Sequence, residues 1–267
     1  MGAKFDPEAA TLAFSKQSTA FDAIDGANPL IGWVRDRVRR VASASMRSGD
    51  RMLELNAGTG IDSTHFAAQG IHVLATDGAV GMVEALRAKQ AARPELPLEV
   101  KHCSFNELSE LDRRFEHVFS NFGGLNCTDR LEHVLREIDR VLLPEGTCTL
   151  VIMPRFSPWE SASILKGNWK MASRRWRKEG AAAVVEGVPF TTTYYSAAFV
   201  RRHLGRNYKV LEQRALSVLV PPPYKEGFTQ HWPLTFRFLS WIEDRIAHLP
   251  VIRNWGDHFV ISLKKTR

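Results

Sequence analysis

Short apolar runs alternate with segments of helical spacing through the middle of the chain. Apolar residues recurring every three or four positions indicate a helix, whereas compact apolar runs indicate buried strands. On this basis we predict strands at residues 52–55, 71–75, 100–105, 115–122 and 148–153, and helices beginning at residues 63, 78 and 131. This alternation is typical of an α/β domain, in which helices cover both faces of a parallel sheet.

The remainder of the chain supplies further elements of the same sheet. We predict a hairpin at residues 182–195, helices at 196–204 and 233–249, and strands at 208–220 and 258–263. With the last two strands added, the predicted fold class is a doubly wound, mostly parallel sheet of seven strands.

A change of texture divides the chain into four predicted parts. Six of the seven tryptophans follow residue 153, where the regular alternation stops. We expect an N-terminal helical lid at residues 1–48, with residues 14–27 closing the site. The ligand-binding core then covers residues 49–153, a substrate-covering insertion covers 154–195, and residues 196–267 complete the core with the last strands and a helical excursion.

The first predicted strand ends in a carboxylate followed by a glycine turn, Leu53-Glu54-Leu55-Asn56-Ala57-Gly58-Thr59-Gly60. A strand, turn and helix in this order direct free backbone amides at a ligand. The fixed anion of Glu54 would repel a pyrophosphate on that turn, whereas it would attract a ligand with sulfonium and ammonium groups. Asp77, about 20 residues beyond the turn, can accept hydrogen bonds from both hydroxyls of a ribose. The pattern therefore indicates S-adenosylmethionine.

At this point the sequence resembles the class I S-adenosylmethionine-dependent methyltransferases, over residues 51–153. The family usually opens with Leu-(Glu or Asp)-Leu-Gly-Cys-Gly-Thr-Gly, and its second strand ends in an acid, here Asp77. The family's Leu-(Lys or Arg)-Pro-Gly-Gly turn is matched by Leu143-Pro144-Glu145-Gly146-Thr147. Asn56 departs from the pattern, because it replaces the first glycine. We interpret it as a variant, since asparagine tolerates a positive φ better than most residues.

The resemblance implies a set of cofactor contacts at the ends of the first four strands. In the family, residues like Met82, Ser104 and Phe105 border the adenine, and the tip of the fourth strand lies where the methyl group and the acceptor meet. The predicted cofactor-binding residues are Glu54, Asn56, Ala57, Gly58, Thr59, Gly60, Asp77, Gly78, Met82, Ser104, Phe105, Ser120 and Asn121. The expected product of the cofactor is S-adenosylhomocysteine.

Methyl transfer asks little of side chains. The methyl group passes in line from sulfur to a nucleophile, so positioning supplies most of the rate, and a base is needed only for a protonated acceptor. The catalytic candidates are Asn121 and His258, the latter as a base held by Asp257, with loop capping and a structural histidine as the alternative interpretations. The predicted substrate-binding residues, for which ordinary packing is the alternative, are Phe21, Phe122, Asn126, Trp159, Tyr194, Tyr195, Tyr224 and His231.

Length and composition add bounds to this interpretation. A chain of 267 residues with 44% hydrophobic content can bury one large sheet. It contains no apolar run long enough to span a membrane and no secretory signal, so we expect a cytoplasmic protein and no membrane partner. The cysteines, Cys103, Cys127 and Cys148, are expected to be reduced thiols. Scattered histidines without ligand spacing predict no metal site.

The main alternative is an RNA methyltransferase. The formal net charge is +7, and residues 166–178 interleave basic residues with tryptophans, which can pair with phosphates and stack on bases. The same run has helical spacing, which fits a solvated basic face around buried tryptophans. The (Asn, Asp or Ser)-Pro-Pro-aromatic motif of enzymes that methylate exocyclic base nitrogens is missing after the fourth predicted strand.

Tryptophans around the presumed pocket favour an aromatic or otherwise apolar acceptor. We therefore predict methyl transfer to a small molecule, at oxygen or nitrogen rather than carbon, and make no prediction of oligomeric state. A second alternative is an inactive protein that binds S-adenosylmethionine, suggested by Asn56 and opposed by the intact Glu54 and Asp77. A dehydrogenase is a third, and it would require glycine or alanine where Ser63 stands.

Overall fold

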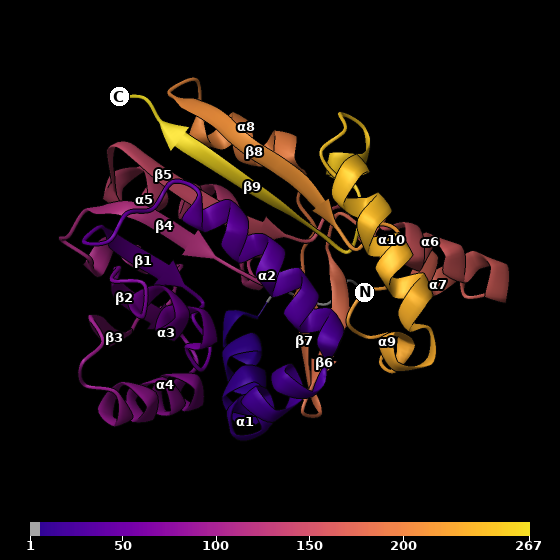
Figure 1. Cartoon of the computed structure of the whole chain (residues 1–267), viewed down its shortest axis with the longest axis horizontal. Coiled ribbons are helices and arrows are strands. Elements are labelled where there is room, and N and C mark those ends of the chain that lie inside the picture. The colour runs from indigo at the N-terminus through magenta and orange to yellow at the C-terminus, as the bar shows by residue number, and fades with distance from the viewer. Residues whose placement is uncertain (1–5) are drawn as a thin grey trace.

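A central sheet with helices on both faces organises the computed structural model, which describes residues 6–267 (Figure 1). The sheet has seven strands in the order β3-β2-β1-β4-β5-β9-β8. The first five are parallel, and β9 runs antiparallel to both of its neighbours, as the predicted fold class requires. The strands are β1 (Arg51–Leu55), β2 (His72–Asp77), β3 (Leu98–His102), β4 (Phe115–Ser120), β5 (Leu142–Ile152), β8 (Tyr208–Leu216) and β9 (His258–Lys265).

Helices surround this sheet, and a separate hairpin of β6 (Ala181–Val185) and β7 (Val188–Thr192) lies apart from it. The longer helices are α1 (Pro7–Ala27), α2 (Pro29–Ser43), α3 (Ile61–Ala67), α4 (Val80–Ala92), α5 (Leu131–Val141), α8 (Ala197–Leu204) and α10 (Pro233–Ile246). The short ones are η1 (Leu108–Glu110), η2 (Gly124–Asn126), α6 (Pro158–Ser161), η3 (Ala162–Lys166), α7 (Trp169–Ala172), η4 (Arg174–Trp176), α9 (Phe228–His231) and η5 (Ile252–Asn254).

The core lies on both faces of the sheet, because successive residues of a strand point to opposite sides. Leu53 and Leu55 of β1 pack in the cluster that includes α5 and α8, whereas Met52 packs in the cluster that includes α2 and α3. Burial on both faces explains why the central strands are continuous apolar runs in the sequence.

Some boundaries differ from the predicted ones for local reasons. Strand β8 ends at Leu216, not at residue 220, because Ser217 has a φ of 59° and the next three backbone amides donate to the Glu243 carboxylate. The turn predicted before β5 is an irregularity within that strand, where Glu145 has a φ of 64°. Helix α1 begins at Pro7, ahead of the segment 14–27 predicted to close the site, because the Asp6 carboxylate caps it by accepting from Glu8 N and Ala9 N.

Strand order fixes where a ligand can bind. Strand β1 pairs with β2 on one side and β4 on the other, so the chain crosses to opposite sides of β1. In doubly wound sheets, such a reversal leaves a crevice at the carboxyl ends of the strands. No helix within residues 6–267 is both long and apolar enough to cross a bilayer.

Candidate functional site

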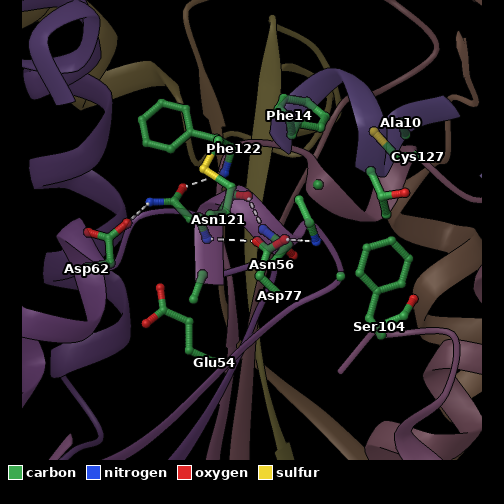
Figure 2. Close-up of a pocket in the computed structure, with 18 of the residues that line it drawn as sticks. Ala10, Phe14, Glu54, Asn56, Asp62, Asp77, Ser104, Asn121, Phe122 and Cys127 are labelled. Carbon is green, nitrogen blue, oxygen red and sulfur yellow. Dashed lines mark hydrogen bonds between the residues drawn. The ribbon is translucent and has the colours of Figure 1, made fainter. Parts of the chain in front are cut away.

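A cavity lies at the carboxyl ends of β1, β2 and β4, facing α1 (Figure 2). The structure brings many of the predicted site residues together in its wall. These are Phe21, Glu54, Asn56, Ala57, Gly58, Asp77, Gly78, Met82, Ser104, Phe105, Asn121 and Phe122. Phe14 of the predicted lid also lines it, as do residues that the sequence did not indicate, namely Ala10, Thr11, Arg35, Ile61, Asp62, Ala79, Asn106, Gly124 and Cys127.

The turn after β1 has the left-handed conformation that its sequence suggested. Asn56 has a φ of 46°, and Gly58 and Gly60 have φ values of 59° and 83°. The Asn56 side chain accepts from Ser120 Oγ at 2.6 Å and donates to the Asn121 carbonyl at 3.0 Å, so it ties β1 to β4. A Cβ on Gly60 would lie 2.0 Å from Leu86 Cδ1, which explains why glycine is needed there.

Asp77 supports this turn from the end of β2. Its carboxylate accepts from Gly58 N and from Ala79 N, each at 2.8 Å. Burial raises the pKa of Asp77, although the backbone amides oppose that shift. A carboxylate has about four acceptor positions, so Asp77 keeps capacity for two further donors from the cavity.

The opposite wall carries a buried charge cluster, which we call the cavity cluster: Asp25, Arg35, Arg39, Glu54 and Asp62. Arg35 pairs with both Asp25 and Asp62, and Arg39 Nε donates to Asp62 Oδ1 at 2.7 Å. Glu54 accepts from Ser63 Oγ at 2.6 Å. Burial, and then the neighbouring Asp62, raise the pKa of Glu54 well above its ordinary value. Ionisation of Glu54 beside the other carboxylates of the cluster is therefore unfavourable.

Among the site residues that sequence reasoning missed, Arg35 is the one with a positive charge. It is 6% exposed, its guanidinium carbon lies 4.6 Å from the centroid of the Phe122 ring, and its Nε has no partner among the described residues. A signal was present, because Arg35 is the one charged residue among the buried positions of α2, with Val34 before it and Val38 after it. A charge on an apolar helix face is expected only where it is paired.

Helix α1 lines one side of the cavity, and the lid role predicted for residues 14–27 stays a prediction. Phe21 ring carbons lie 3.9 Å from where a Cβ would stand on Gly58, and Thr59 Oγ1 donates to Asp22. Near the start of the helix, Phe14 and Phe190 of β7 contact each other with ring centroids 5.7 Å apart. The β6–β7 hairpin of the predicted insertion thus packs against the helix that faces the cavity.

Several predicted residues support the site through hydrogen bonds, and Asn121 alone among them also lines the cavity. Thr59 and Gly60 belong to the turn, and Ser120 lies behind it, bonded to Asn56. Asn121 Nδ2 donates to Asp62 Oδ2 at 2.8 Å, which fixes the amide in the cavity wall (Figure 2). Asn126 is fully buried and bonds to the backbone of Met153 and Thr193, the capping role given as its alternative.

Other predicted substrate residues lie away from the cavity. Tyr195 donates to the Thr128 carbonyl at 2.6 Å inside the core, and the Tyr194 ring lies 5.1 Å from the guanidinium carbon of Arg175. Tyr224 is 43% exposed and His231 is exposed on α9. Trp159 is half-buried on α6. None of these five residues is among those that line the cavity, so their contact with an acceptor stays a prediction.

His258, the predicted base, stands at the start of β9 behind the loop that follows β4. Its Nδ1 lies 3.0 Å from Asp257 Oδ2. Its Nε2 is 3.0 Å from the point where a Cβ would stand on Gly123, and Gly123 has a φ of 67°. The imidazole is therefore held by an acid as predicted, but the 122–124 loop separates it from the cavity.

A second buried charge cluster, the C-terminal cluster, consists of Glu160, Arg174, Arg175 and Asp257. Arg174 and Arg175 donate to Glu160 at 2.6 Å, and Arg175 also donates to Asp257 Oδ1 at 2.8 Å. Burial would raise the pKa of Glu160, but the two arginines hold it below its ordinary value. For Asp257, burial is outweighed by His258 and Arg175, so its pKa is also lowered.

The tryptophans of this region do not surround the cavity, which corrects the basis for an aromatic acceptor. Trp169 is 68% exposed and Trp176 is 63% exposed, whereas Arg175 is 3% exposed. The run at 166–178 therefore reverses the expected arrangement, since an arginine is buried and the tryptophans face solvent. Pairing with Glu160 and Asp257 is what allows the arginine inside.

Comparison with known proteins gives the domain its family. Residues 52–146 match the family model described as a methyltransferase domain. They form a class I methyltransferase domain. The family resemblance is confirmed by this match and by the fold, and S-adenosylmethionine is the cofactor of that family.

Curated relatives match between about half and three quarters of the chain. A demethylmenaquinone methyltransferase of Clavibacter sepedonicus is 34% identical over 143 residues, which are 52% of this chain and 56% of the relative. The chain thus spans about half the length of that relative. A malonyl-[acyl-carrier protein] O-methyltransferase of Yersinia pestis is 24% identical over 74% of this chain and 67% of its own length.

Solved structures extend the likeness in fold across most of the chain. A chain of the complex between the Haloferax volcanii Trm112 methyltransferase activator and a methyltransferase has a TM-score of 0.58 at 18% identity, covering 95% of this chain and 97% of its own. A Burkholderia thailandensis 1,6-didemethyltoxoflavin-N1-methyltransferase has a TM-score of 0.54 at 17% identity, covering 88% and 79%. At these identities the likeness concerns fold alone.

Proposed function

We propose that this protein transfers a methyl group from S-adenosylmethionine to a small-molecule acceptor. One observation carries the proposal: the cavity combines the glycine turn and Asp77 with a cavity cluster whose three carboxylates face only two guanidinium groups. A ligand that brings an ammonium and a sulfonium group compensates the surplus negative charge. A pyrophosphate would add to it.

The residues fit such a ligand along its whole length. Asp77 retains acceptor positions for ribose hydroxyls, and Met82, Ser104 and Phe105 border the same cavity beyond it. At the other end, Glu54 offers a carboxylate for an ammonium group, and the unpartnered Arg35 Nε offers a donor for a carboxylate. When bound, S-adenosylmethionine supplies the methyl group, and these side chains hold it in one orientation.

For the acceptor, the cavity offers Phe14, Phe122 and Cys127, of which Phe14 and Cys127 pack with the hairpin. These side chains favour an apolar or aromatic molecule. The names of relatives and neighbours mention demethylmenaquinone, malonyl groups on a carrier protein and 1,6-didemethyltoxoflavin, with transfer to oxygen or nitrogen in the latter two. These names support a small acceptor, and we propose that the protein acts in the cytoplasm.

Within this proposal, Asn121 positions the acceptor, and His258 removes its proton if the acceptor is protonated. The Asn121 amide is fixed by Asp62 in the cavity wall. His258 is held by Asp257, and the 122–124 loop would have to move aside for His258 to reach the acceptor. His258→Gln would then lower kcat in a pH-dependent way, while an unchanged pH profile would leave His258 a structural residue.

Calorimetric titration with S-adenosylmethionine and with NAD tests the cofactor. Incubation of the protein with methyl-labelled S-adenosylmethionine and fractionated cell extract then tests the acceptor. We expect binding of S-adenosylmethionine only, and label in the small-metabolite fraction. No binding would overturn the proposal, and binding without any labelled product would support the inactive alternative.

RNA remains the second candidate acceptor because Trp169, Trp176, Lys170 and Arg177 are all exposed. The pair Lys170→Gln/Arg177→Gln removes two charges from this surface, and Arg201→Gln/Arg202→Gln removes two from the exposed side of α8 as a control. We expect equal labelling of small metabolites by both pairs. Label in RNA, lost selectively from the first pair, would establish the alternative.

A further inference from the structure

Helix α10 carries an apolar stripe on its solvent side. Leu234 is 77% exposed, Phe238 is 60% exposed and Trp241 is 53% exposed. Their spacing of four and three residues places them on one face of the helix. The Phe238 and Trp241 rings stack, with an interplanar angle of 14°, so the stripe is a contiguous surface. Contiguous exposed apolar surface on a folded domain indicates an interaction site.

This stripe is distinct from the face by which α10 joins the protein. Phe236 and Leu239 pack into the core, and Phe236 meets Trp33 of α2. Glu243 accepts from three backbone amides after β8. The helix is therefore apolar on two sides: one side anchors it, and the other is presented to solvent.

Charges along the exposed face have a single sign. Arg237 and Arg245 are exposed, and neither has an acidic partner among residues 6–267. The Arg245 guanidinium carbon lies 3.7 Å from the centroid of the Trp241 ring, so its charge sits directly on the stripe. The acids of the helix are used elsewhere, since Glu243 is buried and Asp244 pairs with Arg37.

We propose that α10 docks the protein on the surface of an anionic lipid bilayer, with Leu234, Phe238 and Trp241 entering the headgroup boundary. Interfacial helices combine apolar and aromatic insertion with arginines that pair with lipid phosphates. The helix lies toward one end of the molecule, away from β3 and α4 (Figure 1). A helix there with one-signed charge suits an extended anionic surface, and the net charge of +7 strengthens the attraction. This docking does not depend on methyl transfer, and it departs from the expected absence of a membrane partner.

Vesicle flotation tests the docking directly. The full chain is mixed with phosphatidylcholine vesicles, or with phosphatidylcholine vesicles containing phosphatidylglycerol, and bound protein is measured after centrifugation. We expect binding to the anionic vesicles, weak binding to the neutral ones, and loss of binding as salt is raised. No flotation with anionic vesicles at low salt would overturn the proposal.

Two variant pairs locate the surface. Phe238→Ser/Trp241→Ser should weaken binding at least about tenfold through lost insertion, and Arg237→Gln/Arg245→Gln roughly tenfold through lost charge. The matched controls are Val184→Ser/Leu211→Ser and Arg201→Gln/Arg202→Gln, which change exposed apolar and basic residues elsewhere. Circular dichroism verifies that each variant is folded.

Equal loss of flotation in variants and controls would overturn the assignment to α10. Size-exclusion chromatography tests the alternative that a second copy of this chain covers the stripe. If Phe238→Ser/Trp241→Ser converts a dimer to a monomer without changing flotation, the stripe is an interface between copies of this chain, and the bilayer proposal fails.

Discussion

The two buried charge clusters of this protein are built from the same groups, yet they hold charge in opposite ways. The C-terminal cluster sets the two carboxylates of Glu160 and Asp257 against Arg174 and Arg175, and both acids have lowered pKa values. The cavity cluster sets three carboxylates against two arginines, and its Glu54 has a strongly raised pKa.

That difference separates a structural cluster from a binding one. A balanced cluster neutralises itself, so it stabilises only the fold around it. An unbalanced cluster beside a cavity has uncompensated negative charge, which a cationic ligand can neutralise. Substitution of one residue should therefore lower the free energy of unfolding in the C-terminal cluster and the affinity for the ligand in the cavity cluster.

The largest effect is expected in the C-terminal cluster. Arg175→Met leaves Glu160 and Asp257 buried with less compensation, so the free energy of unfolding should fall by about 3–5 kcal/mol in urea denaturation. Arg177→Met, two residues away and exposed, is the control and should cost well under about 1 kcal/mol. The affinity of the folded Arg175→Met protein for S-adenosylmethionine should be unchanged. A loss of affinity without a loss of stability would contradict a purely structural role for the C-terminal cluster.

On the cavity side, Asp77→Ala should weaken binding of S-adenosylmethionine by about 1–3 kcal/mol in calorimetric titration. It removes both the acceptor for ribose hydroxyls and the support of the glycine turn. Asp129→Ala, at an exposed position, controls for loss of an acid. Equal affinities for the two variants would mean that the ribose lies elsewhere.

Glu54 predicts how that affinity depends on pH. Because the pKa of Glu54 is raised in the folded apoprotein, its ionisation destabilises the fold as pH rises from the ordinary value of 4.5 through the folded value. A cationic ligand favours the ionised form, so affinity should rise with pH across the same window, by at most about tenfold per pH unit. Glu54→Gln should flatten this slope. A slope that persists in the variant would place the cation away from Glu54.

The smallest expected effect concerns the turn itself. Asn56→Ala and Asn56→Gly both lose the bonds to β4, but only alanine meets the strain of a φ of 46°. Asn56→Ala should therefore be less stable than Asn56→Gly by about 1 kcal/mol in chemical denaturation. Equal stabilities would show that the left-handed conformation is relaxed in the variants.

The parts of the fold that the sequence predicted are those fixed by local patterns. Strands buried on both faces leave continuous apolar runs, and the turn from Asn56 to Gly60 needs residues that tolerate a positive φ. Asp77 follows from its spacing to that turn. These features depend on neighbours in the chain, so they can be read without the tertiary structure.

The missed or misplaced residues depend on contacts between distant segments. Arg35 reaches the cavity because α2 packs beside Asp62, 27 residues later. The tryptophans could not be assigned because α6 and α7 have four residues each, too short for a periodic pattern to show which side is buried. Tyr194 and Tyr195 look alike in sequence, but one faces Arg175 and the other bonds to Thr128.

Helix α1 contacts three separate segments around the cavity. It contacts the glycine turn through Phe21, α4 through the bond from Gly81 N to Ser15 Oγ, and the hairpin through Phe14 and Phe190. If α1 moved as a rigid helix away from the glycine turn, it would also lose its contacts with α4 and the hairpin. Under the proposed function, one movement of α1 would therefore open the site to cofactor and acceptor together, and we expect the residence times of the two products to rise and fall together.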